Sequence, residues 1–343
     1  MDVFESRKKD HIRISLEERS QIAPSLKGLE KIRLVHEALP EFAFQDVDLS
    51  VQVLGQMLKT PLYISSMTAG HAEGQSINLK LAKAAEAQGW LMGVGSQRKE
   101  LEDSSASSEW KEIRRQAPKA VLFGNLGIAE VIRSPVAQIQ KLVDSLEAQG
   151  FFIHLNPLQE ALQPEGHADF IGGMKAIEKV VKSLSVPVVV KEVGCGISVS
   201  TMKRLADVGV QTIDVSGLGG THWGRIEGFR AETESWQSSV AETFKNWGMT
   251  TLECILNGNE SLVPCQLWAS GGVRNGLEAA KLLSLNVEMV GAAQPFLKAA
   301  VDPAESSVVR LMNVWEQELK LALFCTGHRT VAEFRDARAW EWV

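Results

Sequence analysis

The stretch FFIHLN, residues 151–156, shows the pattern that decides the fold, because its apolar start gives way to polar side chains. Such a run indicates a buried strand, and Pro157 then stops regular extension. The pattern recurs after residue 60, in eight runs: PLYIS (61–65), WLMGVG (90–95), AVLFGN (120–125), FFIHLN (151–156), PVVVKEV (187–193), QTIDVSG (211–217), QLWASGG (266–272) and VEMVGAA (287–293). We therefore predict eight strands with small or polar residues at their carboxyl ends.

Amphipathic stretches between these runs predict helices. Apolar residues recur at helical spacing within residues 77–88, 136–149, 172–185, 199–209 and 276–285. Alternation of strand and helix through eight units predicts an α/β fold, a (β/α)8 TIM barrel. An open, doubly wound sheet is the alternative. The count of eight and the glycine-rich ends of the last three strands favour closure.

We assign residues 61–343 to the barrel together with a C-terminal helix and tail. Two regions lie outside the repeated strand-helix units. Residues 1–60 are expected to form an N-terminal arm and cap, and the tail reads HRTVAEFRDARAWEWV. Its Trp340 and Trp342 would suit burial against a partner subunit. The segment 217–264 exceeds the usual connection of about 2 to 6 residues, so we expect a helix there and a mobile lid.

Composition excludes several classes of protein. The chain has 343 residues, 45% of them hydrophobic, which is enough for a large core. A net charge of −6 and the lack of a long basic run argue against nucleic acid and anionic membranes as partners. No apolar run has the ~20 residues of a membrane span, and the charged start MDVFESRKKDHIRIS has no apolar signal core. The four cysteines lack C-x-x-C spacing. We expect reduced cysteines and a cytoplasmic location.

The strand ends indicate an anion site, because barrel enzymes place their chemistry there. Gly271 and Gly272 follow the seventh strand, and Gly291, Ala292 and Ala293 follow the eighth. Uncovered N–H groups at such positions commonly bind phosphate, although glycine also serves tight turns alone. Lys191 ends a buried strand, where its ammonium needs an anion or an electron-rich ring such as a flavin. A pairing with Glu192 or Asp214 is the alternative.

Several motifs together resemble one family, the type 2 isopentenyl-diphosphate isomerases, which are FMN-dependent (β/α)8 enzymes of isoprenoid biosynthesis. The matching stretches are RKKDHI (7–12), SMTAG (66–70), MGVGSQR (92–98), NLG (125–127), HLNPLQEALQPEG (154–166), VVKEVGCGIS (189–198), DVSGLGGTHW (214–223) and SGGVRNG (270–276). The resemblance covers nearly the whole chain in consistent order. HLN-x-LQE and GVGSQR are far more specific than glycine-rich turns.

The resemblance implies interconversion of isopentenyl and dimethylallyl diphosphates by a 1,3-allylic proton shift. An alkene is a very weak base, so side-chain acids match it poorly. Reduced FMN would provide the acid/base group through N5, NADPH or NADH would reduce it, and Mg²⁺ would hold the diphosphate. The resemblance also implies a homo-oligomer of four or eight subunits. It leaves open whether the flavin or Gln159 acts as acid and base.

Site residues carry over from the resemblance position by position. The catalytic group comprises His154, Asn156, Gln159, Trp223 and Glu227 on the substrate side, and Glu160 would bind Mg²⁺. Substrate binding falls to Arg7, Lys8, His11, Ser96 and Arg98, with Asn156 and Gln159. FMN binding falls to Ser66, Met67, Thr68, Ser96, Asn125, Lys191, Ser216, Thr221, Gly272, Arg274, Ala292 and Ala293.

Elementary chemistry agrees with part of this assignment. Mg²⁺ accepts one or two carboxylates plus phosphate oxygens, so a single glutamate suffices. The cations of the N-terminal arm suit a segment that folds over a diphosphate. Without the resemblance, a lone loop glutamate and a charged terminus would be read as solvated and frayed.

Two departures and two rivals accompany the resemblance. SMTAG stands where SMTGG is usual, and His222 replaces a small polar residue. A 2-hydroxy acid oxidase or dehydrogenase would need a histidine base and an arginine in an HGGR-like stretch, which THWGR, with His222 and Arg225, approaches. The dehydrogenase form of this rival, acting through a loop cysteine, is weaker, because Cys195 has no evident adjacent base. A non-catalytic flavin or phosphate binder would have no need of the polar HLNPLQE cluster.

Overall fold

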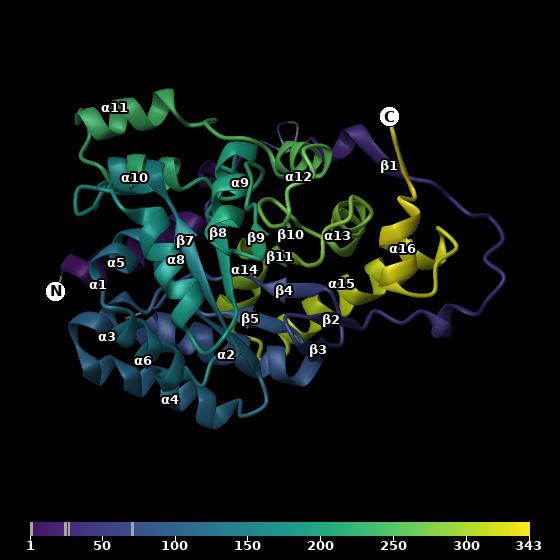
Figure 1. Ribbon diagram of the computed structural model, residues 1–343, viewed down its shortest axis with the longest axis horizontal. Helices are drawn as coiled ribbons and strands as arrows, with labels where there is room; N and C mark the ends of the chain where they lie inside the picture. The colour runs from purple at the N-terminus through teal and green to yellow at the C-terminus, as the bar shows by residue number, and fades with distance from the viewer. Residues whose placement is uncertain (1–2, 24–25, 27, 70–71) are drawn as a thin grey trace.

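In the computed structural model, which describes residues 3–23, 26, 28–69 and 72–343, eight parallel strands form one sheet (Figure 1). They are β4 (Leu62–Ile64), β5 (Leu91–Gly93), β6 (Val121–Gly127), β7 (Gly150–Leu155), β8 (Val188–Glu192), β9 (Thr212–Asp214), β10 (Gln266–Trp268) and β11 (Val290–Ala292). The order is β10-β9-β8-β7-β6-β5-β4-β11. A bridge from Ala269 to Val290 joins the two ends, where Gly291 N donates to Ala269 O at 2.8 Å. The sheet is therefore a barrel, and the open alternative is wrong.

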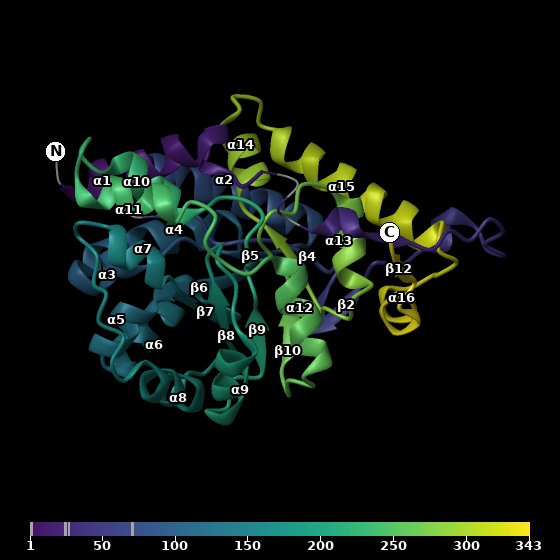
Figure 2. The same cartoon turned by 90° about the horizontal axis from the view of Figure 1, so that it is seen from above.

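Helices surround the barrel as the spacing of apolar residues predicts (Figure 2). The longer ones are α2 (Ala72–Gln88), α4 (Ser107–Gln116), α6 (Val136–Leu146), α8 (Gly173–Ser183), α9 (Val199–Asp207), α12 (Thr251–Glu260), α13 (Gly276–Leu283) and α15 (Ser307–Phe324). Short helices follow four strand ends: α3 (Arg98–Glu102), α5 (Ile128–Arg133), α7 (Pro157–Leu162) and α14 (Gln294–Val301). Each short helix therefore begins at the end of the barrel where the predicted site lies.

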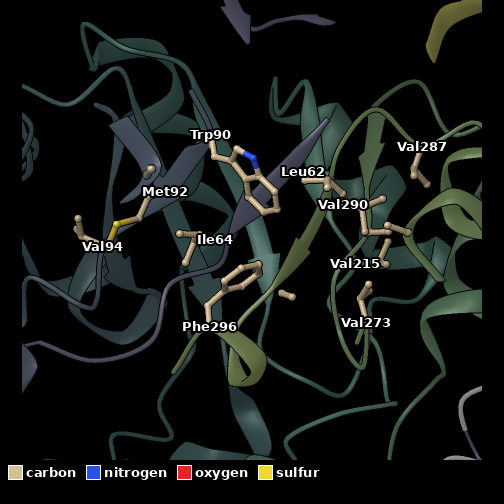
Figure 3. Close-up of a cluster of buried hydrophobic side chains, with 14 of the residues drawn as sticks. Leu62, Ile64, Trp90, Met92, Val94, Val215, Val273, Val287, Val290 and Phe296 are labelled. Atoms are coloured by element: carbon tan, nitrogen blue, oxygen red, sulfur yellow. The ribbon is translucent and has the colours of Figure 1, made fainter. Parts of the chain in front are cut away.

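The core has two layers, one inside the barrel and one between the strands and the helices. Leu62 and Ile64 point outward, where they join Trp90 and Phe296 in the outer layer (Figure 3). Tyr63, between them in sequence, points inward, as the alternation of a strand requires. The inner layer contains Tyr63, Leu91, Phe123, Phe152, Val189, Trp268 and Met289. These side chains fill the barrel interior, so an open site can exist only at an end.

The N-terminal arm begins as a helix. α1 (Val3–Ser15) lies beside α10 (Trp223–Arg230) in both views (Figures 1 and 2), and the frayed alternative is wrong for residues 3–15. The hairpin of β2 (Val51–Val53) and β3 (Gln56–Leu58) places Val53 and Leu58 in the inner layer. It therefore closes the end of the barrel opposite the strand ends. The division at residue 60 stays a prediction.

The C-terminal tail pairs with the arm. β12 (Trp340–Trp342), which follows α16 (Val331–Ala337), runs antiparallel to β1 (Ile32–Leu34). Trp342 remains 57% exposed. The expected burial of these tryptophans against a partner subunit stays a prediction, because the tail already has a partner strand within its own chain.

The long segment after β9 contains helices, as expected, and a mobile lid within it stays a prediction. It contains α10, α11 (Trp236–Thr243) and α12. α10 contacts both α1 and α7, so it forms part of the rim around the strand ends. Among the described residues, no helix combines the length and the apolar composition that a membrane crossing needs.

Candidate active site

The strand ends and α1 line one cavity, and it brings together every predicted site residue except Glu227. The predicted residues that line it are Arg7, Lys8, His11, Ser66, Met67, Thr68, Ser96, Arg98, Asn125, His154, Asn156, Gln159, Glu160, Lys191, Ser216, Thr221, Trp223, Gly272, Arg274, Ala292 and Ala293. The arm residues come from α1, far away in sequence from the strands. Gly70, the last residue of the SMTAG motif, lies outside the described residues.

One part of the cavity fits a phosphate. Gly271 and Gly272 have φ values of 96° and 85°, and a Cβ on Gly272 would lie 2.3 Å from the carbonyl oxygen of Gly219. Backbone N–H groups therefore stand uncovered here. Arg274 Nη1 is buried without a hydrogen-bond partner in the described part of the chain. α14 begins beside it at Ala293 without a side-chain cap. An anion would satisfy these donors.

The loops that follow β4 and β5, together with Asn125 of β6, fit a flat polar ring. Ser66 Oγ is buried and finds no partner among the described residues. Gly95 lets the loop approach, since a Cβ there would lie 2.0 Å from Thr68 O. Asn125 Nδ2 donates to Val94 O at 3.2 Å, which fixes the orientation of its amide. The unpaired hydroxyl and these fixed polar groups fit the hydrogen-bonding edge of FMN.

Lys191 and His154 lie side by side on β8 and β7. Lys191 Nζ donates to Glu192 O at 2.6 Å and lies 3.7 Å from Asp214 Oδ2. The carboxylate of Glu192 instead accepts the N–H groups of Val193 and Gly194 at 2.7 and 2.6 Å. Of the two predicted alternatives for the side chain of Lys191, only the pairing with Asp214 is present.

The tautomer of His154 follows from its partner. His154 Nδ1 lies 2.9 Å from Asn125 Oδ1, which can only accept, so Nδ1 carries the proton. Burial, with the charges of Lys191 and Lys8, lowers the pKa of His154 to about 3. His154 is therefore neutral at physiological pH, with a lone pair on Nε2.

The polar residues of HLNPLQE form one network at the start of α7. Asn156 Nδ2 donates to Gln159 Oε1 at 3.1 Å and to Glu160 Oε1 at 2.9 Å. His167 N donates to Glu160 Oε2 at 2.6 Å. Within the described ranges, no three His, Cys, Asp or Glu side chains gather as a complete metal site. A cation at Glu160 would therefore need oxygen ligands from a substrate.

Cations from two elements meet at the same end of the cavity. Arg7 and Lys8 come from α1, and Arg98 begins α3. Burial, together with the charges of Arg7 and Arg98, lowers the pKa of Lys8 to about 8. These three positive groups repel one another, and a multivalent anion bound among them would offset that repulsion.

Glu227 is not among the residues that line the cavity, so its predicted place on the substrate side is not confirmed. It is fully buried on α10, where Oε1 lies 2.9 Å from His11 Nε2 and accepts Gln159 Nε2 at 3.2 Å. Arg230 contacts its other oxygen. Burial alone would raise the pKa of Glu227, but the donors His11 and Arg230 outweigh it and lower the pKa. Glu227 therefore contacts two lining residues, His11 and Gln159, from outside the cavity.

Among the lining residues that were not predicted as site residues, Glu130 and Gln163 each contact a predicted arginine. Glu130 Oε1 lies 3.2 Å from Arg98 Nη1, and burial raises the pKa of Glu130. Gln163, oriented to satisfy both ends of its amide, accepts from Arg7 Nη1 at 3.1 Å and donates to Glu227 Oε1 at 3.2 Å. Gln163 follows Gln159 by four residues, so helical spacing offered a signal. Glu130 had none beyond its place after a strand.

His222 has a structural role, which removes the main support for an oxidase. Arg225 N donates to His222 Nδ1 at 3.3 Å, so Nε2 carries the proton and donates to Trp247 O at 3.0 Å. The ring caps α10 and does not line the cavity. Cys195 Sγ lies 3.7 Å from this Nε2, but burial raises the pKa of its thiol. Neither residue offers a base or a nucleophile to the site.

The chain matches the family described as FMN-dependent dehydrogenase over residues 3–151 and 166–341. Solved structures agree in fold: a mandelate oxidase variant with 2-hydroxy-phenylacetamide matches with a TM-score of 0.65 and 17% identity over 98% of this chain and 94% of its own. A flavocytochrome b2 variant with sulfite bound has a TM-score of 0.68 and 20% identity over 96% and 82%. The fold and the match define the class as the FMN-dependent dehydrogenases.

Curated relatives narrow this class. An isopentenyl-diphosphate delta-isomerase of Bdellovibrio bacteriovorus is 52% identical over 98% of this chain and 97% of the relative. Those of Legionella pneumophila (strain Corby) and a Nostoc species are 46% and 42% identical, over 97% and 96% of this chain and 97% and 94% of the relatives. The chain belongs to the isopentenyl-diphosphate delta-isomerase family.

Proposed function

We propose that the protein interconverts isopentenyl diphosphate and dimethylallyl diphosphate with FMN bound at the strand ends. The observation that carries this proposal is the meeting, in one cavity, of two separate anion-binding regions with the Asn156 network. One region, at Gly272 and Arg274, suits the FMN phosphate. The other, at Arg7, Lys8 and Arg98, suits a diphosphate. Residues 152–165, which carry the network, lie outside the match to the dehydrogenase family, as expected if they serve a different reaction.

Reduced FMN, when bound, would supply the acid/base group that an alkene requires. The role of the protein is then to hold and isolate the reactants. Lys191 provides a cation at the strand end, and Asn125 and Ser66 provide fixed polar groups. Neutral His154, with Nδ1 committed to Asn125, presents only an acceptor toward its surroundings. The amide of Gln159 cannot ionise, so we infer that it orients the carbon that gains or loses a proton.

Glu160 would hold Mg²⁺ against the diphosphate. Asn156 fixes Oε1 of its carboxylate, and His167 N fixes Oε2, so the group is oriented before the metal arrives. The three cations Arg7, Lys8 and Arg98 would neutralise the remaining charge. Glu227 would position Gln159 and His11 rather than contact the substrate.

The decisive experiment counts product per electron. With air excluded and the flavin reduced once by dithionite or NAD(P)H, isopentenyl diphosphate should give many product molecules per electron delivered, because moving a double bond consumes none. The oxidised protein should be inactive. A ratio near one, or activity only with oxidised flavin and an acceptor, would contradict the proposal and favour a 2-hydroxy acid oxidase. The choice of NADPH or NADH, the number of subunits and a cytoplasmic location stay predictions.

A further inference from the structure

A buried carboxylate lies directly behind the lining of the cavity. Asp214 ends β9, is completely buried and does not line the cavity. Tyr63 OH donates to its Oδ2 at 2.6 Å, and Ser270 Oγ lies 2.9 Å from both oxygens. Ser216 N donates to Oδ1 at 3.1 Å, and Lys191 Nζ lies 3.7 Å from Oδ2. All four partners can donate, so one carboxylate contacts groups from β4 and β8 and from the loops after β9 and β10.

Three of these four partners line the cavity: Lys191, Ser216 and Ser270. Ser216 has a φ of 36°, which is unusual for a side chain with a Cβ. The hydrogen bond from its own N–H to Asp214, two residues earlier, offsets the cost of this conformation. Asp214 therefore sets the backbone at Ser216 as well as the environment of Lys191.

The barrel is built to bring the fourth partner to Asp214. Tyr63 comes from β4 and reaches across the interior, and a Cβ on Gly291 would lie only 2.2 Å from its Cζ. Burial, and then the charge of Asp214, raises the pKa of Tyr63 well above its usual range. Tyr63 therefore keeps its proton and donates a hydrogen bond to Asp214.

We propose that Asp214 is a positioning residue that sets how strongly Lys191 favours reduced FMN. Its negative charge lies against the ammonium and offsets part of the positive field that Lys191 directs into the cavity. Without that charge, Lys191 would stabilise the anionic reduced ring more strongly. This inference rests on the proposed function only for the identity of the flavin.

The test is the ratio of the affinities for reduced and oxidised FMN, obtained from the flavin midpoint potential. Asp214→Asn should raise this ratio by about tenfold or more, the size expected for removing a unit charge near a buried group. An unchanged or lower ratio would overturn the proposal. Tyr63→Phe, which leaves the charge in place, is the matched control and should change the ratio by less than about threefold.

Two further variants keep the test independent of folding and of isomerase activity. In a Lys191→Met background, Asp214→Asn should have little effect, since a double-mutant cycle isolates the coupling between the pair. An undiminished effect there would overturn action through Lys191. If Asp214→Asn does not fold, the double variant Tyr63→Phe/Ser270→Ala provides the test of the proposal instead. Removing both donors leaves the carboxylate charge less neutralised, so the ratio should fall, and a rise or no change would contradict the proposal. A protein that binds no FMN in either state would instead refute the proposed function.

Discussion

The two regions of the cavity that we propose bind anions are built in different ways. At Gly271, Gly272 and Ala293 the chain offers backbone N–H groups from the barrel itself. At Arg7, Lys8 and Arg98 it offers charged side chains, two of them from a helix outside the barrel. A backbone site is fixed when the barrel folds, whereas a side-chain site depends on the docking of α1. We expect the first to hold a permanent cofactor and the second a substrate that enters and leaves.

The strongest test of substrate binding at the second region is Glu160→Gln, which alters the proposed Mg²⁺ ligand for the same diphosphate. Turnover should fall by about a hundredfold or more, because the metal loses its only proposed carboxylate. FMN content should not change, since no flavin group contacts this side chain in the proposal. The measurement is initial rate against Mg²⁺ concentration, with the visible spectrum as control. An unchanged magnesium dependence would remove Glu160 from the metal site.

The first region can be broken by one methyl group. Gly272→Ala should lower FMN affinity by about tenfold to a hundredfold, because its Cβ would meet Gly219 and its φ of 85° is unfavourable for alanine. Gly172→Ala is the matched control: its φ is 82°, but nothing lies within 4 Å of the added atom. Flavin titration of the apoprotein measures both. Equal losses in the two variants would mean that backbone strain, and not the shape of the site, matters.

A smaller effect should separate two glutamates that share one arginine. Arg98 contacts Glu130 at 3.2 Å inside the cavity and Glu102 at 3.3 Å on the surface. Glu130→Gln should raise the KM for isopentenyl diphosphate by about fivefold to tenfold, because the buried partner orients Arg98. Glu102→Gln should change it by less than about twofold, as for an exposed pair. Similar KM values for both variants would deny Glu130 a positioning role.

The smallest expected effect is a pH dependence confined to the arm. The pKa of Lys8 is lowered to about 8, so the side chain is charged below that pH and loses its charge above it. Affinity for the diphosphate should therefore fall by about threefold to tenfold between pH 7 and pH 9. Lys8→Met should bind more weakly at pH 7 and show a flatter profile. A steep profile in the variant would assign the titration to another group.

The sequence predicts the barrel well because its evidence is local. Each strand can be recognised from about six consecutive residues. The eight runs and the amphipathic stretches between them coincide with strands and helices. The predicted phosphate region can also be recognised locally, since the glycines at 271 and 272 indicate a backbone with positive φ. Local sequence patterns therefore predict the parts of the site that are formed by backbone groups.

The remaining site depends on contacts between distant segments, which no local pattern encodes. Glu227 entered the predicted site through the resemblance alone, and the structure places it against His11 of the arm. His222 was the nearest approach to the histidine base of the rival oxidase, but its partners are Arg225 N and Trp247 O. Glu130 and Gln163 acquire meaning only when α3, α1 and α7 meet. The resemblance supplied Glu227 but not its partners, and it supplied neither Glu130 nor Gln163.

Closure of the barrel has a consequence for how the chain folds during synthesis. β4 spans residues 62–64, and its neighbour on one side, β11, spans residues 290–292. Until the ribosome has made that last strand, β4 exposes a row of unpaired backbone groups, which is a known route to aggregation. The contact also joins segments far apart in sequence, so its formation is slow. We expect a nascent chain of this protein to depend on chaperones until β11 emerges, and most strongly when translation pauses within the last third of the barrel.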